Sequence, residues 1–138
     1  MRHLVARAGL NDMVSVESAG TAAYHAGEPP DRRSRMAARS RGIEVDGRAR
    51  QFLREDWDKM DYVLALDRNN YDDLRREAPS KRALSKLFLL RSFDSASPEG
   101  ASVPDPYYGG EDGFEEVLDL CEAACAGLLE HIRREHGI

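Results

Sequence analysis

Tyr-Val-Leu-Ala-Leu, residues 62–66, is an unbroken run of apolar residues between two aspartates. A short continuous run of this kind is typical of a strand that is buried on both faces. A second run, Leu-Phe-Leu-Leu, occupies residues 87–90, and a segment with helical character between the two runs stops at Pro79. Strands that alternate with helices indicate a parallel sheet, so these runs decide the fold class.

The segments on either side continue the alternation of strands and helices. Met13–Ser18 places apolar residues between polar ones and predicts a further strand. Asp31 is a suitable N-cap for a helix that ends at Gly42. We therefore expect an α/β fold with a parallel sheet in one domain that spans residues 1–138. The predicted helices cover Met1–Leu10, Asp31–Gly42, Arg54–Met60, Asn70–Arg76 and the segment from Asp112 onward.

Length and composition exclude several classes of protein. A chain of 138 residues is long enough for one buried core, and 41% hydrophobic with 33% charged residues is ordinary for a globular protein. The net charge of −5 argues against a general nucleic-acid binder. No segment approaches the roughly 20 apolar residues of a membrane span, and none has the layout of a signal peptide. With only two cysteines, the sequence is expected to belong to the reducing cytoplasm.

The segment Val103–Gly110 reads Val-Pro-Asp-Pro-Tyr-Tyr-Gly-Gly. Its prolines fix φ on both sides of Asp105 and favour an extended, stiff loop. A carboxylate that a rigid loop presents beside aromatic rings is suited to the role of a general acid. The alternative interpretation is a proline- and glycine-rich turn before the last helix.

The order of residues in Asp-Pro-Tyr-Tyr-Gly closely resembles the low-molecular-weight protein-tyrosine-phosphatase family. Further matches occur in the same order along the chain, at Ser18–Thr21, Gly27–Asp31, Arg48–Gln51 and Asp61–Asp67. The resemblance covers essentially the whole chain. It implies the phosphotyrosine phosphatase I-like fold, a three-layer sandwich around a parallel sheet.

The resemblance also implies roles for individual residues. Asp105 matches the aspartate that protonates the leaving tyrosine oxygen, and Tyr107 and Tyr108 match residues that border the substrate cleft. Tyr24 and His25 fall where the family has a variable recognition loop. The alternatives are that the two tyrosines at 107 and 108 pack on the surface and that the histidine is a bystander.

Two further residues are expected to support the site. Ser18 matches a serine that supports the phosphate-binding loop by hydrogen bonding, with a cap at the end of a strand as the alternative. Asp67 fits the rim of the site, or else only caps the next helix. Many relatives have a histidine before the position of Arg48, where this chain has Gly47.

The family's nucleophile loop, Cys-x5-Arg-Ser/Thr, is not found in these 138 residues. Met1–Val5 resembles the middle of the helix that follows that loop, so we expect the first strand and the loop to be absent and the chain to be inactive as it stands. Two explanations are open: a start codon that is assigned too far downstream, or a true truncated form of the protein. Cys121 and Cys125 lie four apart on the apolar side of the last helix and are interpreted as small buried hydrophobes, with a redox role as the alternative.

The intact parent activity that the resemblance implies is hydrolysis of phosphotyrosine-type monoesters through a cysteinyl-phosphate, without metal or other cofactor. The substrate would be a phosphotyrosine protein or a small aryl phosphate. A non-catalytic pseudophosphatase that binds partners is the alternative. Arsenate reduction on the same fold requires extra cysteines after the strand, and Asp67–Asp73 has none. His131 and His136 are five apart and do not share one helical face, so no metal site is predicted.

Two expectations concern surfaces. The arginines between Arg32 and Arg54 are interpreted as a solvated face, with attraction of an anionic substrate as the alternative. Loss of an interior strand leaves unpaired backbone groups on both sides of a gap. We therefore predict a homodimer or higher oligomer joined through sheet edges or an exchanged element, with no nucleic acid and no membrane as partner.

Overall fold

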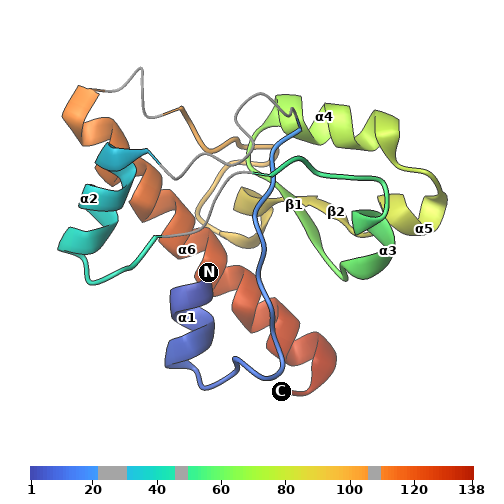
Figure 1. The fold of residues 1–138 in the computed structure, drawn as a ribbon, viewed down its shortest axis with the longest axis horizontal. Coiled ribbons are helices and arrows are strands. Elements are labelled where there is room, and N and C mark those ends of the chain that lie inside the picture. The colour runs from blue at the N-terminus through green and yellow to red at the C-terminus, as the bar shows by residue number, and fades with distance from the viewer. Residues whose placement is uncertain (22–30, 46–49, 106–109) are drawn as a thin grey trace.

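The structure is a computed structural model that describes residues 1–21, 31–45, 50–105 and 110–138. α4 packs against both strands, whereas α1, α2 and η1 all pack against α6 (Figure 1). The sheet therefore lies between two layers of helices, which confirms the predicted α/β fold. The elements follow in the order α1 (Arg2–Arg7), α2 (Arg32–Ser40), α3 (Asp56–Lys59), β1 (Val63–Ala65), α4 (Arg68–Glu77), α5 (Lys81–Leu84), β2 (Leu87–Leu89), the 3-10 helix η1 (Leu90–Phe93) and α6 (Gly110–His136).

The strands β1 and β2 pair in parallel, as predicted, with Val63 opposite Leu87 and Ala65 opposite Leu89. These four side chains are buried in one core cluster with Trp57, Leu74 and Ala83. The expectation of burial on both faces was only partly right. The side chain of Leu64 lies on the opposite face, toward α6. It is half-buried because it lines a cavity beside β1.

The strand predicted at Met13–Ser18 is wrong. Residues 14–19 belong to no strand and no helix, and the described part of the chain offers them no neighbouring strand. The first ladder contact comes later, where Gly20 forms a parallel bridge with Gln51. The N–H of Gly20 donates to the C=O of Arg50 and its C=O accepts from the N–H of Phe52, both at 2.8 Å. A strand needs a partner that exchanges backbone hydrogen bonds, and the described residues offer none to residues 14–19.

The helix α2 begins and ends where the sequence predicts. The carboxylate of Asp31 accepts a hydrogen bond from the N–H of Arg33 at 2.8 Å. At the other end Gly42 has φ 76°, and the N–H of Ile43 donates to the C=O of Ala38 at 3.0 Å. This Schellman arrangement needs a left-handed residue, which explains the glycine.

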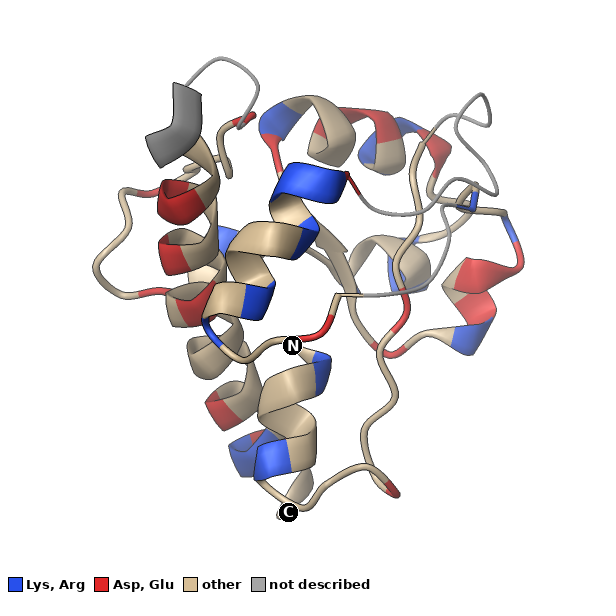
Figure 2. Cartoon of the chain, turned by 60° about the vertical axis from the view of Figure 1, so that its left-hand side comes forward, with Lys and Arg blue, Asp and Glu red and all other residues tan. Residues whose placement is uncertain are grey.

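α2, with its basic residues, packs against α6, which carries several acidic residues (Figure 2). Arg41, which follows α2, forms ion pairs with acidic residues along α6, namely Glu115, Asp119 and Glu122. The guanidinium of Arg41 has a raised pKa because it donates hydrogen bonds to Glu115 and Asp119. Its charge is therefore balanced within the fold.

Among the described residues no helix is long and apolar enough to cross a membrane.

The longest helix, α6, begins at Gly110, two residues before the predicted start at Asp112. It crosses η1 so closely that a Cβ atom at Gly127 would lie 1.9 Å from the carbonyl oxygen of Phe93. The neighbouring atom is backbone, so it cannot rotate away. Only glycine fits at this crossing.

We expect Gly127→Ala to destabilise the protein by about 1–3 kcal/mol, because the added methyl forces α6 away from η1. Helix propensity alone predicts the opposite sign, since alanine is favoured over glycine by about 1 kcal/mol in a helix interior. Urea unfolding measures the change. The control is Ala123→Gly at an exposed position of the same helix, which should cost only its propensity. A Gly127→Ala variant as stable as wild type would show that the crossing can relax.

Asp56 at the start of α3 is the buried carboxylate of the described core, with 5% of its surface exposed. It accepts hydrogen bonds from Nη1 of Arg50 at 2.8 Å and from the N–H of Leu53 at 2.7 Å. These two partners, Arg50 foremost, lower the pKa of Asp56. The ion pair also reaches Glu17, whose carboxylate lies 2.9 Å from Nη2 of the same arginine. The cluster ties the segment after α1 to α3.

We expect Asp56→Asn to cost about 1–2 kcal/mol at pH 7, a value reduced by the partial exposure of Arg50. A lowered folded pKa stabilises the protein above the unfolded value of roughly 4, and that stabilisation disappears as the pH falls through the folded pKa. The difference between wild type and variant should therefore shrink below about pH 4. Urea unfolding at pH 7 and at pH 3 measures it. Asp58→Asn, exposed on the same helix, should change stability little at either pH.

Candidate active site

The loop before Asp105 is fastened to the carboxyl end of β1. The C=O of Leu66 accepts a hydrogen bond from the N–H of Val103 at 2.7 Å. Next to it, the N–H of Arg68 donates to Oγ of Ser102 at 2.9 Å. In sheets of parallel strands, ligands bind outside the carboxyl ends of the strands. These two hydrogen bonds therefore bring Asp105 to the edge of the sheet where a site is expected.

Asp105 itself is exposed, so a solute can reach its carboxyl group. Pro104, buried Val103 and the bond to Leu66 limit how far it can move from the strand end. The predicted substrate-binding residues lie outside the described residues, and their roles stay predictions. They are Tyr24, His25, Tyr107 and Tyr108.

Ser18 is exposed and lines a cavity of about 290 Å³, which lies between residues 16–21 and residues 62–66. The same cavity is lined by Leu66 and by Asn70 at the start of α4. Since residues 14–19 form no strand, the alternative role of Ser18 as a strand-end cap has no strand to cap. Its predicted support of a phosphate loop stays a prediction.

Asp67 follows β1 and begins α4. Its Oδ1 accepts a hydrogen bond from the N–H of Asn70 at 2.7 Å, so the side chain caps the helix. The structure thus shows the helix cap, which is one of the two roles that the sequence suggests for Asp67. The capped helix start also fixes Asn70, which sequence reasoning did not single out, at the wall of the cavity.

Arg50 is a second residue that the sequence did not assign a role. It lines the same cavity, and its pKa is raised mainly by the hydrogen bond to Asp56. Its partner Glu17 is 33 residues away in the sequence, so no local pattern could have predicted the pair. Arg50 joins the wall of the cavity to the α3 core, and its charge is already balanced by two carboxylates.

The cysteines lie elsewhere. Both are free thiols on α6, with Cys125 buried and Cys121 half-buried. Cys125 belongs to the core cluster of Leu90, Leu128 and Ile132, and Cys121 packs against that cluster. This agrees with their interpretation as small hydrophobic residues. Among the described residues no group of His, Cys, Asp or Glu could hold a metal ion.

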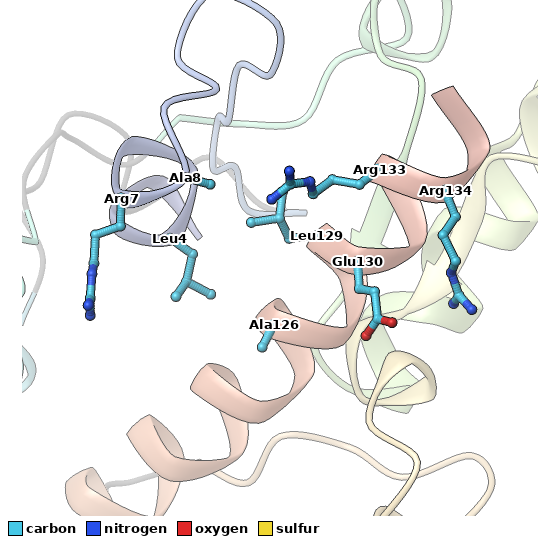
Figure 3. A pocket seen from close by; sticks show the side chains of 8 residues that line it. All are labelled: Leu4, Arg7, Ala8, Ala126, Leu129, Glu130, Arg133 and Arg134. Atoms are coloured by element: carbon cyan, nitrogen blue, oxygen red, sulfur yellow. The ribbon is translucent and has the colours of Figure 1, made fainter. Parts of the chain in front are cut away.

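A larger, open cavity of about 650 Å³ is lined by residues of α1 and by residues 126–134 of α6 (Figure 3). Apolar side chains such as Leu4 and Leu129 line it, and Arg7, Glu130 and Arg133 add charges. None of the predicted site residues lines it. Its size therefore does not make it the active site.

The sequence is similar to known phosphatases over nearly its whole length. Residues 1–137 match the family described as low molecular weight phosphotyrosine protein phosphatase. The low molecular weight protein-tyrosine-phosphatase of Streptomyces coelicolor is 45% identical over 135 residues, which is 97% of this chain and 82% of that protein.

Solved structures agree with this match. The crystal structure of a protein tyrosine phosphatase from Entamoeba histolytica, with Hepes in its active site, superposes with a TM-score of 0.88 at 36% identity and covers 99% of this chain and 85% of that one. YfkJ from Bacillus subtilis superposes with a TM-score of 0.88 at 38% identity over 98% of this chain and 83% of that one. The chain belongs to the low molecular weight phosphotyrosine protein phosphatase family.

Proposed function

We propose that this chain supplies the general acid, Asp105, of a hydrolase of phosphotyrosine-type monoesters. Its 138 residues alone do not complete the reaction. One observation carries the proposal. The carboxyl end of β1 holds the Asp105 loop, whereas both cysteines of the sequence belong to the packed face of α6. These residues therefore do not place a nucleophilic cysteine beside the acid Asp105.

The acid role follows from the leaving group. A phenol has a pKa of about 10, so a phenolate leaves slowly unless a proton reaches its oxygen as the ester bond breaks. Asp105 is exposed and its loop is held by the Leu66–Val103 hydrogen bond, so its carboxyl group can meet the ester oxygen of a bound aryl phosphate. Tyr107 and Tyr108 would form the walls for the aryl ring, and Tyr24 and His25 a more variable rim.

Neither cysteine is suited to attack phosphorus, Cys125 because it is buried in the core and Cys121 because its thiol is seldom ionised. Burial raises the pKa of the Cys121 thiol to about 11, with a smaller contribution from Cys125. At neutral pH only about one thiol in ten thousand would be ionised at that pKa, whereas a catalytic cysteine is ionised by nearby cations or a helix N-terminus. The cysteinyl-phosphate step of the family therefore needs a Cys-x5-Arg-Ser/Thr segment in addition to residues 1–138. A metal or cofactor is not part of the proposal.

The alternatives remain distinct. A pseudophosphatase that binds partners through the same edge would show no turnover even when a nucleophile segment is supplied. Arsenate reduction is disfavoured because Asp67–Asp73, at the start of α4, contains no cysteine. The cytoplasmic location and the homodimer or higher oligomer stay predictions.

We expect alkylation of Cys121 by iodoacetamide to keep rising with pH up to about 11, because the raised pKa limits the thiolate. At pH 7 its rate in the folded protein should be roughly two to three orders of magnitude below that of the urea-unfolded chain, whose thiols have a pKa near 8.5. Mass spectrometry after a timed quench measures it. Rapid, selective labelling of folded Cys121 at pH 7 would contradict its assignment to the core.

We expect the 138-residue chain to release no phosphate from an aryl phosphate above background. Joining a strand and a Cys-x5-Arg-Ser/Thr segment ahead of Met1 should produce turnover. In that fusion, Asp105→Ala should slow phenyl phosphate about 10²–10⁴-fold and slow an ester of a very acidic phenol less, as expected for a lost acid. Glu99→Ala, exposed in the same loop, is the control. Turnover by the unextended chain that Asp105→Asn abolishes would contradict the proposal.

A further inference from the structure

The arginines of α2 and of the residue that follows it form two rows on separate flanks of the helix. Residues 32–41 contain no aspartate or glutamate. An α-helix turns by about 100° per residue, so residues three, four or seven apart lie on the same flank. This spacing places Arg33 and Arg41 in one row. The other row consists of Arg32, Arg35 and Arg39.

The fold itself provides partners for the first row. Nε of Arg33 lies 3.5 Å from Oδ1 of Asp31, and the guanidinium of Arg33 lies 4.9 Å from the ring centre of Phe114 on α6. Arg41 forms the three ion pairs with α6 that were described above. The flank of α2 that carries this row therefore faces α6, and its charges are used within the molecule.

The second row, which we call the arginine row, has no such partners. Within the described part of the chain, no hydrogen bond or ion pair engages the side chains of Arg32, Arg35 and Arg39. Arg32 and Arg39 are exposed, and Arg35 between them is half-buried. Nε of Arg35 is shielded from solvent and has no hydrogen-bond acceptor among the described residues. Because buried donors in native proteins are almost always hydrogen-bonded, Arg35 calls for an acceptor from outside the fold.

We propose that the arginine row binds an extended acidic peptide segment of a partner protein. Arg32 and Arg39 are seven residues apart, which is about 10.5 Å along the helix. Carboxylates at alternate positions of an extended peptide are about 7 Å apart, so three of them span a length that long arginine side chains can match. Each guanidinium can hold one carboxylate through two parallel hydrogen bonds. A ligand with a single anionic group would engage only part of the row.

The surroundings of the row favour a peptide over a membrane or a nucleic acid. Glu115 and Asp119 of α6 lie beside the other flank of α2, and the whole chain has a net charge of −5 (Figure 2). A flat anionic membrane would approach these carboxylates together with the row, and the phosphates of a nucleic acid would continue past its ends. A short peptide meets the row alone. This inference does not depend on the proposed catalysis.

Met36 lies next to the arginine row. It is exposed, and it is four residues after Arg32 and three before Arg39, so its side chain is a neighbour of both. The thioether can therefore contact the methylene groups of glutamate side chains that bind to the row. The methyl group of Met36 also serves as a reporter of binding.

The probe is a dye-labelled peptide, Ser-Glu-Ser-Glu-Ser-Glu-Ser, and the control peptide has glutamine in place of each glutamate. Fluorescence anisotropy at about 50 mM salt, where exposed charges are weakly screened, measures binding. Replacement of the whole row by glutamine, which keeps helix propensity, should weaken probe binding at least about tenfold. This variant is Arg32→Gln/Arg35→Gln/Arg39→Gln. A matched control removes three exposed arginines elsewhere and should bind as wild type; it is Arg54→Gln/Arg75→Gln/Arg82→Gln.

A second measurement locates the bound peptide on the wild-type protein. With ¹³C-labelled methionine methyl groups, the probe should shift the NMR signal of Met36. It should leave the signal of Met60 unchanged, because Met60 follows α3, and α2 and α3 lie on opposite sides of the molecule (Figure 1). This readout needs no substitution, so it decides the matter should the row variant fail to fold.

Four outcomes overturn the proposal. The first is equal binding of the glutamate and glutamine peptides, and the second is equal weakening by the two triple variants. The third is tighter binding of phosphatidylserine vesicles or RNA than of the probe, which would assign the row to a membrane or a nucleic acid. The fourth is a wild-type dimer, shown by light scattering, that the row variant dissociates, which would assign the row to a second copy of the chain.

Discussion

The close crossing of α6 over η1 fixes the rest of the structure. η1 follows β2 without a break, so a helix that touches the backbone of Phe93 is set directly against the end of the sheet. Gly127 makes this approach possible, because any side chain would meet a carbonyl group that cannot move aside. The position of α6 then determines which of its residues face the sheet. Leu128 and Cys125 are among them, and α1 and α2 in turn pack on α6.

The two faces of α6 have different roles. One face of α6 completes the apolar core beneath β1, and both cysteines fall on it. The outer face carries the acidic residues that balance Arg41 after α2. The candidate site lies at the carboxyl end of the sheet, where η1 continues from β2 and α4 begins shortly after β1. There Leu66 holds the Asp105 loop by a single backbone hydrogen bond. None of the predicted site residues lies on α6.

Much of this could be predicted from local sequence. The runs at residues 62–66 and 87–90 gave two strands, and Asp31 gave a helix start, because burial and capping depend on neighbouring residues. Met13–Ser18 alternates as a strand should, yet pairing needs a partner that local pattern cannot show. From the sequence alone, Gly127 is only a residue of low helix propensity inside a helix. Its contact with the backbone of Phe93 explains why glycine is needed there. The link between Glu17 and Arg50 depends likewise on a contact far apart in sequence.

The cavity of about 290 Å³ and the candidate site meet at Leu66. Ser18 and Leu66 both line this cavity. The C=O of Leu66 also accepts the hydrogen bond from Val103 that holds the loop of Asp105. Because side chain and backbone of one residue serve both, the cavity wall and the Asp105 loop cannot move independently at this point. The short strand β1 therefore does more than stabilise the core, since the residue that follows it fixes where the candidate acid lies.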